Sequence, residues 1–512
     1  MLNSPSFSPN AHNPDVLTCL ANLSSDEVFT PPHMANRMLD LLPAALWCDE
    51  TARFLDPMCK SGVFLREMAR RLDAGLAEKI PDPQTRLNHI FQKQLFGLAI
   101  TDLTALLARR SVYCSKTANG KYSVCDGFAD EQGNVRFERV AHSWKNGRCG
   151  FCGASEKEYE RGETLETHAY QFIHTENPEE LFKMKFDVII GNPPYQLSTG
   201  GSGVQAIPLY HKFVLQAKKL NPRYLTMIIP ARWYSGGFGL DSFRDEMLKD
   251  NRIRNIVDYP EASDAFSNVQ IKGGVCYFLW DRDNPGNVKV STFRKDKIVS
   301  EEERPLLEAG ASTFVRYNEA ISILHKVRNQ PSHTMDSVVS SQKPFGFATT
   351  YVGTKAKHNA DDVLIYGSKG NGYCPLEDIK VNVELVDQHK VLIPRAGSGS
   401  DKFPHSILGR SFIPSGHSAC TETYVVIGPF GSEEECSNVR SYISTRFFRF
   451  LVMLMKPTQD ALKRVYSFVP IHDFTKPLTD EMLYKKYGLV KNEIAFIESM
   501  IRPMIEGESD DE

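Results

Sequence analysis

The sequence predicts an α/β protein in which a mostly parallel sheet is followed by a second, mixed α/β domain. From residue 26 to about 283, short apolar segments alternate with helical patterns, which is typical of βα units. One apolar segment, Phe186–Ile190, stops abruptly at the sequence Gly191-Asn-Pro-Pro-Tyr195. From about residue 336 the composition changes to short strand-like segments punctuated by glycine and proline. A chain of 512 residues is long enough for two such domains.

The apolar segments of the first domain are short and bounded by turn residues, as buried strands are. An insertion at residues 113–172 interrupts the alternation with polar sequence that contains glycine and cysteine. The predicted strands are Arg53–Leu55, Leu95–Ile100, Phe186–Ile190, Tyr224–Ile229, Ile253–Tyr259 and Gly274–Trp280.

The remaining segments follow from shifts in composition. We expect a flexible lead-in (1–25), a connector (284–335) with a helix at Tyr317–Arg328, a mixed domain (336–475) with strands Lys390–Pro394 and Thr423–Ile427, a C-terminal helical segment (476–505) and an acidic tail (506–512).

Bulk composition limits the class of protein. The net charge of −3 and the pI of about 6.6 show no global basic field, although a local basic cleft would suffice for a nucleic acid. No apolar stretch approaches the ~20 residues of a membrane span, and the N-terminus lacks a signal-peptide pattern. Eleven cysteines without secretion indicate free or metal-bound thiols in a reducing cytoplasm.

The segment Asn192–Tyr195 follows a buried strand, at the edge where open α/β sheets bind their ligands. The side-chain oxygen of Asn192 and the carbonyl of Pro193 can both accept hydrogens from an exocyclic amine. Pro193 and Pro194 hold the backbone rigid, and Tyr195 offers a stacking face. The alternative is a strand that merely ends in a Pro-Pro turn.

A second motif lies near the N-terminus, where Arg53–Leu65 has the pattern of strand, sharp turn and helix. Gly62 lets the chain pass close to a ligand, and the free amides of the turn can bind a carboxylate. Upstream, Thr30-Pro31-Pro32 precedes the helical pattern Met34–Leu42. Thr30 is a candidate hydroxyl donor to a ligand, and the alternative is an ordinary helix N-cap with proline in the first turn; both roles can hold at once.

Together these motifs resemble the gamma-class N6-adenine DNA methyltransferases of restriction-modification systems, an Asn-Pro-Pro-Tyr family with a C-terminal target-recognition domain. The resemblance implies a class I (Rossmann-like) methyltransferase domain at 26–283, dependent on S-adenosylmethionine. The family's Asp-Pro-x-Cys-Gly-Ser-Gly turn corresponds to Asp56–Gly62, with Lys60 in place of the first glycine. The implied catalytic residues are Asn192, Pro193, Pro194 and Tyr195, and the implied cofactor-binding residues are Thr30, Pro31, Asp56, Pro57, Cys59 and Gly62.

The resemblance also implies a pocket for the target base, with a flipped-out adenine between Tyr195 and Phe266. The alternative for Phe266 is a core aromatic. The ribose contact stays open, because Ala99 stands where the family has an acidic residue, and Asp102 either replaces it or caps a helix. Asp126 and His174 are both candidates for the contact with the cofactor's adenine.

Four cysteines of the insertion, Cys114, Cys125, Cys149 and Cys152, lie close together in sequence, and Cys149-Gly-Phe-Cys-Gly153 resembles half of a zinc knuckle. Four thiolates suit a closed, structural zinc site, so we expect a zinc-ribbon-like insertion. His142 is an alternative to one of the thiols. The other alternative is free thiols in a surface insertion.

In the second domain, basic residues alternate with aromatic and hydroxyl side chains, which favours contacts with phosphates and bases. The resemblance implies a site-specific DNA adenine-N6 methyltransferase of a restriction-modification or phage-defence system. Its partners would be double-stranded DNA and a separately encoded restriction endonuclease, in the cytoplasm of a bacterium or archaeon, associated with the nucleoid. The alternatives are an RNA or protein-glutamine N-methyltransferase, and a DNA-binding defence component with weak or no methylation. The basic segments are Pro394–Asp401, Ser441–Arg449 and Lys456–Arg464.

Overall fold

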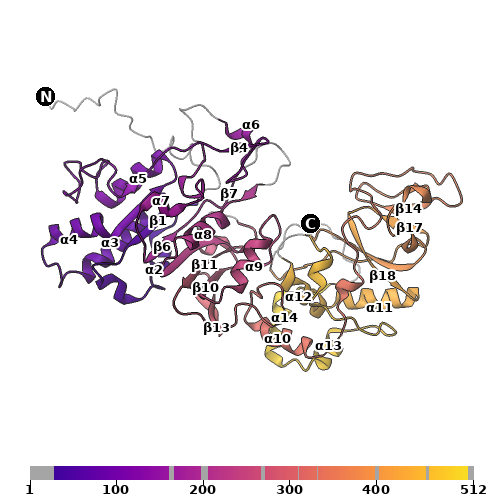
Figure 1. Cartoon of the computed structure of the whole chain (residues 1–512). Coiled ribbons are helices and arrows are strands. Elements are labelled where there is room, and N and C mark those ends of the chain that lie inside the picture. Colours follow the sequence, from indigo (N-terminus) through magenta and orange to yellow (C-terminus); the bar gives the residue numbers. More distant parts are fainter. Residues whose placement is uncertain are drawn as a thin grey trace, which may run out of the picture. The chain divides into compact units, whose positions relative to one another are not determined.

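The computed structural model divides the chain into two compact units, Met1–Leu307 and Glu308–Glu512 (Figure 1). The predicted lead-in (1–25) and acidic tail (506–512) lie outside the described residues. No helix in the described part of the chain is long and apolar enough to cross a membrane. The structure describes residues 28–160, 167–197, 206–266, 271–309, 311–330, 332–397, 403–456 and 460–504.

The first unit is built on a nine-stranded sheet in the order β13-β12-β10-β11-β9-β6-β1-β2-β3. Strands β3, β2, β1, β6 and β9 run parallel, and β11 lies antiparallel between β9 and β10. All six predicted strands are confirmed. The strands are β1 (Phe54–Cys59), β2 (Leu95–Ala99), β3 (Val135–Arg136), β6 (Val188–Gly191), β9 (Tyr224–Pro230), β10 (Ile253–Tyr259), β11 (Val275–Asp281), β12 (Val288–Arg294) and β13 (Lys297–Arg304).

Helices connect these strands, as the alternating pattern predicts. Helices α3 and α5 contact β2, and α8 contacts β9. Their apolar faces are buried, for example Phe64, Leu65, Met68 and Leu72 of α3. The helices of this unit are α2 (Pro32–Leu39), α3 (Val63–Gly75), α4 (Pro83–His89), α5 (Asp102–Tyr113), α6 (Glu156–Tyr159), α7 (Pro178–Phe182), α8 (Tyr210–Lys219) and α9 (Asp241–Lys249).

Two boundaries differ from the sequence-based expectation. The connector predicted from residue 284 is wrong in its first part, because β12 and β13 extend the sheet there. Val288 and Val290 are buried in β12, whereas β13 is an edge strand rich in glutamate, and its exposed charges hid the strand pattern. The predicted insertion, 113–172, contains β3, the opposite edge of the same sheet. The rest of that segment includes the hairpin β4 (Trp144–Lys145) and β5 (Arg148–Cys149).

The second unit has two small sheets, β15-β14-β17 and β16-β18, and a mainly helical core. The predicted strands Lys390–Pro394 and Thr423–Ile427 correspond to β16 and β18, and the predicted helix Tyr317–Arg328 corresponds to α10. The elements of the second unit up to residue 455 are α10 (Glu319–Arg328), β14 (Val363–Tyr366), β15 (Gly372–Cys374), β16 (His389–Pro394), β17 (Ser418–Cys420), β18 (Tyr424–Phe430), α11 (Glu433–Ser444) and α12 (Arg446–Met455).

The C-terminal helical segment folds as two helices, α13 (Asp480–Lys486) and α14 (Lys491–Met500). Gly488, with φ of +60°, lies in the turn between them, in the left-handed region that favours glycine. The apolar residues predicted to pack on the second domain do so. Leu483, Tyr487, Ile494, Ile497 and Ile501 all belong to its core or pack against it.

Candidate active site

The turn after β1 places the start of α3 beside the carboxyl end of β6. Gly62 is the N-cap of α3 with φ of +72°, and no side chain caps the helix. A Cβ on Gly62 would lie 3.0 Å from the backbone of Ala108 in α5, so only glycine fits this close approach. The first amides of α3 have no acceptor within the helix, which makes this end of the helix suitable for binding an anion.

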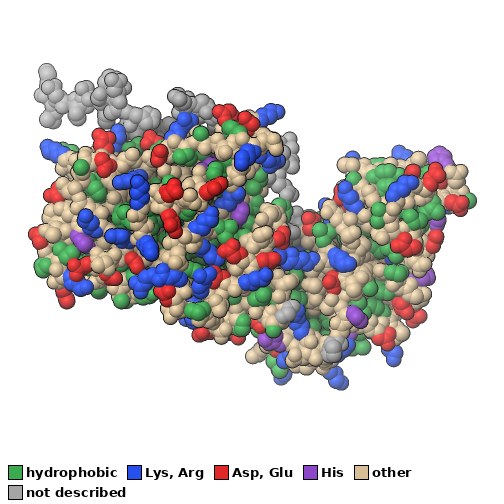
Figure 2. Space-filling view, in the orientation of Figure 1, with side chains coloured by type: hydrophobic (Ala, Val, Ile, Leu, Met, Phe, Trp, Pro, Cys, Tyr) green, Lys and Arg blue, Asp and Glu red, His purple; other side chains and the backbone are tan. Residues whose placement is uncertain are grey.

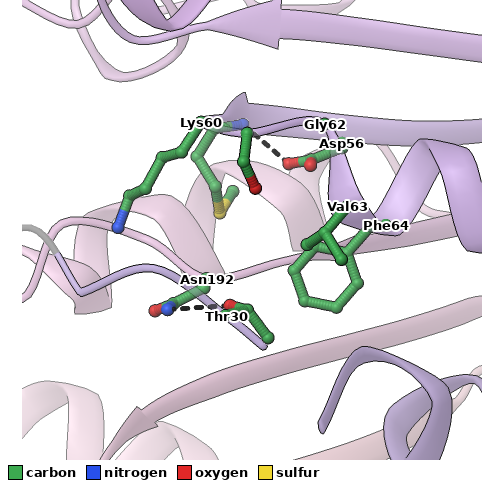
Figure 3. A pocket seen from close by; sticks show the side chains of 9 residues that line it. Thr30, Asp56, Lys60, Gly62, Val63, Phe64 and Asn192 are labelled. Carbon is green, nitrogen blue, oxygen red and sulfur yellow. Dashed lines mark hydrogen bonds between the residues drawn. The ribbon is translucent and has the colours of Figure 1, made fainter. Parts of the chain in front are cut away.

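Asn192 follows β6 and is only 3% exposed. Its Nδ2 donates hydrogen bonds to the carbonyl oxygen of Val28 at 3.0 Å and to Oγ1 of Thr30 at 3.1 Å (Figure 3). A carbonyl oxygen only accepts, so the amide nitrogen must face Val28. The opposite atom, Oδ1 of Asn192, is buried and has no hydrogen-bond partner. An acceptor of this kind, held in position and unpaired, is costly unless a ligand supplies the donor.

These segments line a small pocket that is partly open to solvent. Three stretches that are far apart in the sequence meet there, namely the segment before α2, the turn between β1 and α3, and the end of β6 (Figure 3). The pocket therefore lies at the carboxyl ends of two adjacent parallel strands, where ligands bind in open α/β sheets. Its lining residues are Thr30, Asp56, Met58, Lys60, Ser61, Gly62, Val63, Phe64 and Asn192.

Asp56 is a buried carboxyl group in this pocket, 2% exposed. Its Oδ1 accepts a hydrogen bond from the backbone N–H of Met58 at 3.2 Å. Burial raises the pKa of Asp56 to about 7, against the opposing effects of Met58, Cys59 and Lys60. A Cβ at Gly191 would lie 3.0 Å from Oδ1 of Asp56, so the glycine before Asn192 allows β6 to approach this carboxyl group.

Lys60, the departure from the glycine of the related motif, is accommodated without strain. Its φ does not lie in the left-handed region, so glycine is not needed at this position. The side chain is buried, and Nζ donates to the carbonyl oxygen of Val28 at 3.0 Å. That carbonyl also accepts from Asn192. Lys60 thus helps to hold the segment before α2 against the turn of the pocket.

The predicted cofactor-binding residues divide into two groups. Thr30, Asp56 and Gly62 line the pocket, whereas Pro31, Pro57 and Cys59 do not. The N-cap alternative for Thr30 is wrong, because Pro31 occupies the N-cap position of α2 and no side chain caps that helix. The residues that sequence reasoning missed are Met58, Lys60, Ser61, Val63 and Phe64, all within or just after the predicted turn.

The two predicted stacking residues do not line the pocket. Tyr195 is 6% exposed and Phe266 is 2% exposed, and both pack in the interior of the first unit. The hydroxyl of Tyr195 is buried without a hydrogen-bond partner. Phe266 follows a short 3-10 helix, Ala262–Asp264, and its N–H donates to the carbonyl of Ala262. A base could reach these rings only after the surrounding side chains had moved.

Other candidates take different places. Asp102 is exposed at the start of α5, whose N-cap is Thr101, so the capping role suggested for Asp102 is wrong. Asp126 is exposed and accepts a hydrogen bond from Asn88. Neither carboxylate lines the pocket.

The cysteine insertion groups different residues from those predicted. His142, Cys149, Cys152 and His174 each offer a ligand atom, and these atoms lie within 4.8 Å of one another. Cys114, exposed at the end of α5, and Cys125 do not belong to this group, so the four predicted cysteines do not lie in one cluster. His174 does not line the pocket described above.

One predicted nucleic-acid segment is also corrected. Ser441–Arg449 forms the end of α11 and the start of α12, where Phe447 and Phe448 are fully buried in the core. Arg449 is 1% exposed and donates to backbone carbonyls of Ser406, Ser444 and Thr445. These side chains stabilise the fold and are not available to DNA.

The fold and the pocket are those of an α/β enzyme that binds a ligand. Comparison with known proteins shows to which family the chain is related. The family described as Eco57I restriction-modification methylase matches residues 93–266. A Mycoplasma pneumoniae protein described as an uncharacterized adenine-specific methylase is 40% identical over 311 residues, covering 55% of this chain and 73% of that protein. The chain belongs to this family of adenine-specific methylases of the restriction-modification type.

The solved structures to which the chain is similar are more distant in sequence. A nuclease-deletion mutant of the Type ISP restriction-modification enzyme LlaGI, in complex with a DNA substrate mimic, is 13% identical with a TM-score of 0.47, over 92% of this chain and 46% of that one. The Type IIL enzyme MmeI in complex with DNA is 11% identical with a TM-score of 0.44, over 85% and 62%. The chain spans about half to two thirds of the solved chains it matches.

Proposed function

We propose that this methylase transfers a methyl group from S-adenosylmethionine to N6 of an adenine flipped out of double-stranded DNA. The observation that carries the proposal is the buried, unpartnered Oδ1 of Asn192, whose amide nitrogen is engaged by Val28 and Thr30. This leaves a rigid acceptor facing away from those two bonds. An exocyclic amine can supply the donor that such an acceptor lacks.

The chemistry of the amine explains why an acceptor is needed. The lone pair of the adenine amine is delocalised into the ring, so the nitrogen is a poor nucleophile. Hydrogen bonds from its two N–H groups to Asn192 Oδ1 and the Pro193 carbonyl would favour a tetrahedral nitrogen with a localised lone pair. Pro193 and Pro194 hold these acceptors in place, so little reorganisation accompanies the reaction.

The pocket also fits the methionine end of S-adenosylmethionine. The uncapped start of α3 offers backbone donors to a carboxylate, and Asp56 offers a buried carboxyl group to an ammonium. When bound, the cofactor supplies an already activated methyl group, so the protein mainly supplies position and electrostatics. The sheet order, with an antiparallel strand between β9 and β10, supports the assignment to the class I methyltransferases.

DNA as the substrate is supported by the size of the second unit, which RNA and protein-glutamine methyltransferases of this type lack. Basic and acidic side chains are interspersed over the visible surface, so recognition would depend on local contacts (Figure 2). Lys463 and Arg464 are exposed in a short 3-10 helix of the second unit. Among the basic residues of the three predicted segments that the structure describes, they are the best placed to contact phosphates. We further infer a role in restriction-modification or phage defence, with a separately encoded endonuclease.

The test is methylation of plasmid DNA from a host that lacks adenine methylation, with labelled S-adenosylmethionine. The digested nucleosides are analysed by mass spectrometry, and modified positions are mapped by sequencing. We expect N6-methyladenine at one short sequence. Label found only in N4-methylcytosine, in RNA or in protein would contradict the proposal. A protein that binds DNA but leaves it unmethylated would also contradict it.

A further inference from the structure

We propose that His142, Cys149, Cys152 and His174 bind one structural Zn²⁺ ion that fixes the insertion next to the segment following the Asn-Pro-Pro-Tyr motif. Their ligand atoms lie within 4.8 Å of one another. Nδ1 of His142 lies 3.4 Å from Sγ of Cys152. A tetrahedral zinc ion with usual Zn–S and Zn–N bond lengths separates such atoms by about 3.6 Å. The observed distance is close to this separation, and without an ion it is that of a hydrogen bond between the Cys152 thiol and Nδ1.

The tautomer of His142 is set by a backbone carbonyl. Its Nε2 lies 2.7 Å from the carbonyl oxygen of Thr167. Because a carbonyl oxygen only accepts, Nε2 carries the hydrogen and Nδ1 carries the lone pair. The lone pair thus faces Cys152. A histidine that binds a metal ion characteristically donates its other N–H to a carbonyl or carboxylate in this way.

His174 repeats the arrangement with its nitrogens exchanged. Its Nδ1 lies 2.8 Å from the carbonyl oxygen of Tyr170, so Nδ1 carries the hydrogen. Its Nε2 is buried and has no hydrogen-bond partner. A buried, unpaired acceptor is unfavourable by itself, and a metal ion would satisfy it. Two histidines from separate segments therefore present their lone pairs to the same pair of thiols.

The cysteines lie in a tight turn that brings their sulfurs together. Cys149 ends β5, and the N–H of Gly153 donates to its carbonyl oxygen at 2.9 Å. Gly153 has φ of +81°, which closes the turn in a conformation that favours glycine. The Cys-x-x-Cys spacing is common in structural zinc sites.

The ligand set identifies both the ion and its role. Two thiolates and two imidazoles favour zinc over cations that prefer oxygen ligands. With four protein ligands the site has no open position for water or substrate, so its role would be structural.

The ion would join the insertion to the segment around His174, and both are held against α8. From α8, Lys212 donates to the carbonyl of Phe151, and Gln216 donates to the carbonyls of Phe172 and Thr175 at 3.0 and 2.8 Å. The residue before α8, Leu209, donates its N–H to the carbonyl of Tyr195 at 2.9 Å. By holding the insertion against α8, the metal ion would stabilise the position of Tyr195, the last residue of the Asn-Pro-Pro-Tyr motif.

The first experiment measures metal content in the untagged full chain, purified without chelator. We expect about one zinc ion per chain, as for a structural site. Cys149→Ser and Cys152→Ser should lose most of it, and their matched controls Cys114→Ser and Cys125→Ser should retain it. Wild-type protein without stoichiometric zinc would overturn the proposal, as would loss of zinc in the control variants.

A second measurement needs no variant and so remains decisive if the serine variants do not fold. X-ray absorption at the zinc edge of the wild-type protein should show two sulfurs at about 2.3 Å and two nitrogens at about 2.0 Å. Four sulfurs would overturn the assignment in favour of the four cysteines. Oxygen ligands alone would indicate an adventitious ion and would also overturn it.

Discussion

The side chain of Asn192 donates a hydrogen bond to Oγ1 of Thr30 at 3.1 Å, although 162 residues separate them. This bond joins the Asn-Pro-Pro-Tyr segment to the Thr-Pro-Pro segment, and the two residues lie side by side in the pocket (Figure 3). Together with the carbonyl of Val28 it determines which way the amide of Asn192 faces. These two motifs, far apart in the sequence, therefore form one hydrogen-bonded unit.

Asn192→Ala should abolish methyl transfer, because it removes the acceptor proposed to bind the amine. Loss of one such polar group lowers kcat by about 10²-fold to 10³-fold. Methyl transfer is measured with labelled cofactor, and cofactor binding by calorimetry shows whether the pocket survives. The control is Asn177→Ala, an exposed asparagine outside the pocket. Activity within threefold of wild type in Asn192→Ala would contradict the catalytic role.

Thr30→Val keeps the shape of the side chain but removes the hydroxyl that accepts from Asn192. A neutral hydrogen bond contributes about 1 kcal/mol, so we expect kcat to fall by about five- to tenfold. Thr30→Ser retains the hydroxyl and should restore most of the rate. Equal rates for the valine and serine variants would show that the bond does not position Asn192.

Lys60→Met should weaken cofactor binding more than it changes kcat. Nζ of Lys60 holds the carbonyl of Val28, and without it the segment before α2 is less firmly attached to the pocket. We expect the Kd for S-adenosylmethionine to rise about tenfold, the effect of losing one hydrogen bond to a charged group. Lys116→Met, at an exposed position, is the control. An unchanged Kd would count against this role.

The carboxyl group of Asp56 should make stability depend on pH. Burial raises its pKa to about 7, above the usual value of about 3.9 in unfolded chains. Its contribution to stability is therefore fully present below about pH 4 and is lost as the pH rises through about 7. Asp56→Asn stays neutral, so between pH 5.5 and 8 its Tm should fall less than that of the wild type. Parallel Tm curves for the two proteins would refute the raised pKa.

Alanine substitutions at Gly62 and Gly147 allow the energetic effect of the close packing at Gly62 to be measured. Gly62 and Gly147 have nearly equal φ, +72° and +75°, but a Cβ at Gly62 would meet Ala108 at 3.0 Å, whereas one at Gly147 would have nothing within 4 Å. Gly147→Ala should cost about 1 kcal/mol of unfolding free energy from backbone strain alone. Gly62→Ala should cost about 1–3 kcal/mol more from overpacking. Equal losses in denaturant unfolding would show that α3 and α5 can separate.

Local patterns were sufficient for much of the fold. The apolar segment at Phe186–Ile190 and its five companions became strands of one sheet, because each carries its own apolar sequence and turn residues. The pattern failed at β13, where the glutamates of an exposed edge resemble a connector. It also failed at Ser441–Arg449, because an arginine can be buried when backbone carbonyls accept its hydrogen bonds.

The sequence by itself determined which segments form the strands, the glycine turn and the Asn-Pro-Pro-Tyr motif. Only the tertiary structure decided their partners, since nothing in the sequence indicates that the Val28 carbonyl accepts hydrogen bonds from both Asn192 and Lys60. The insertion shows the same division. Cysteine spacing suggested Cys114 and Cys125, but the folded chain brings His142 and His174 to the thiols instead. The physical reason is that strand and turn preferences act between neighbours, whereas a binding site depends on contacts between distant segments.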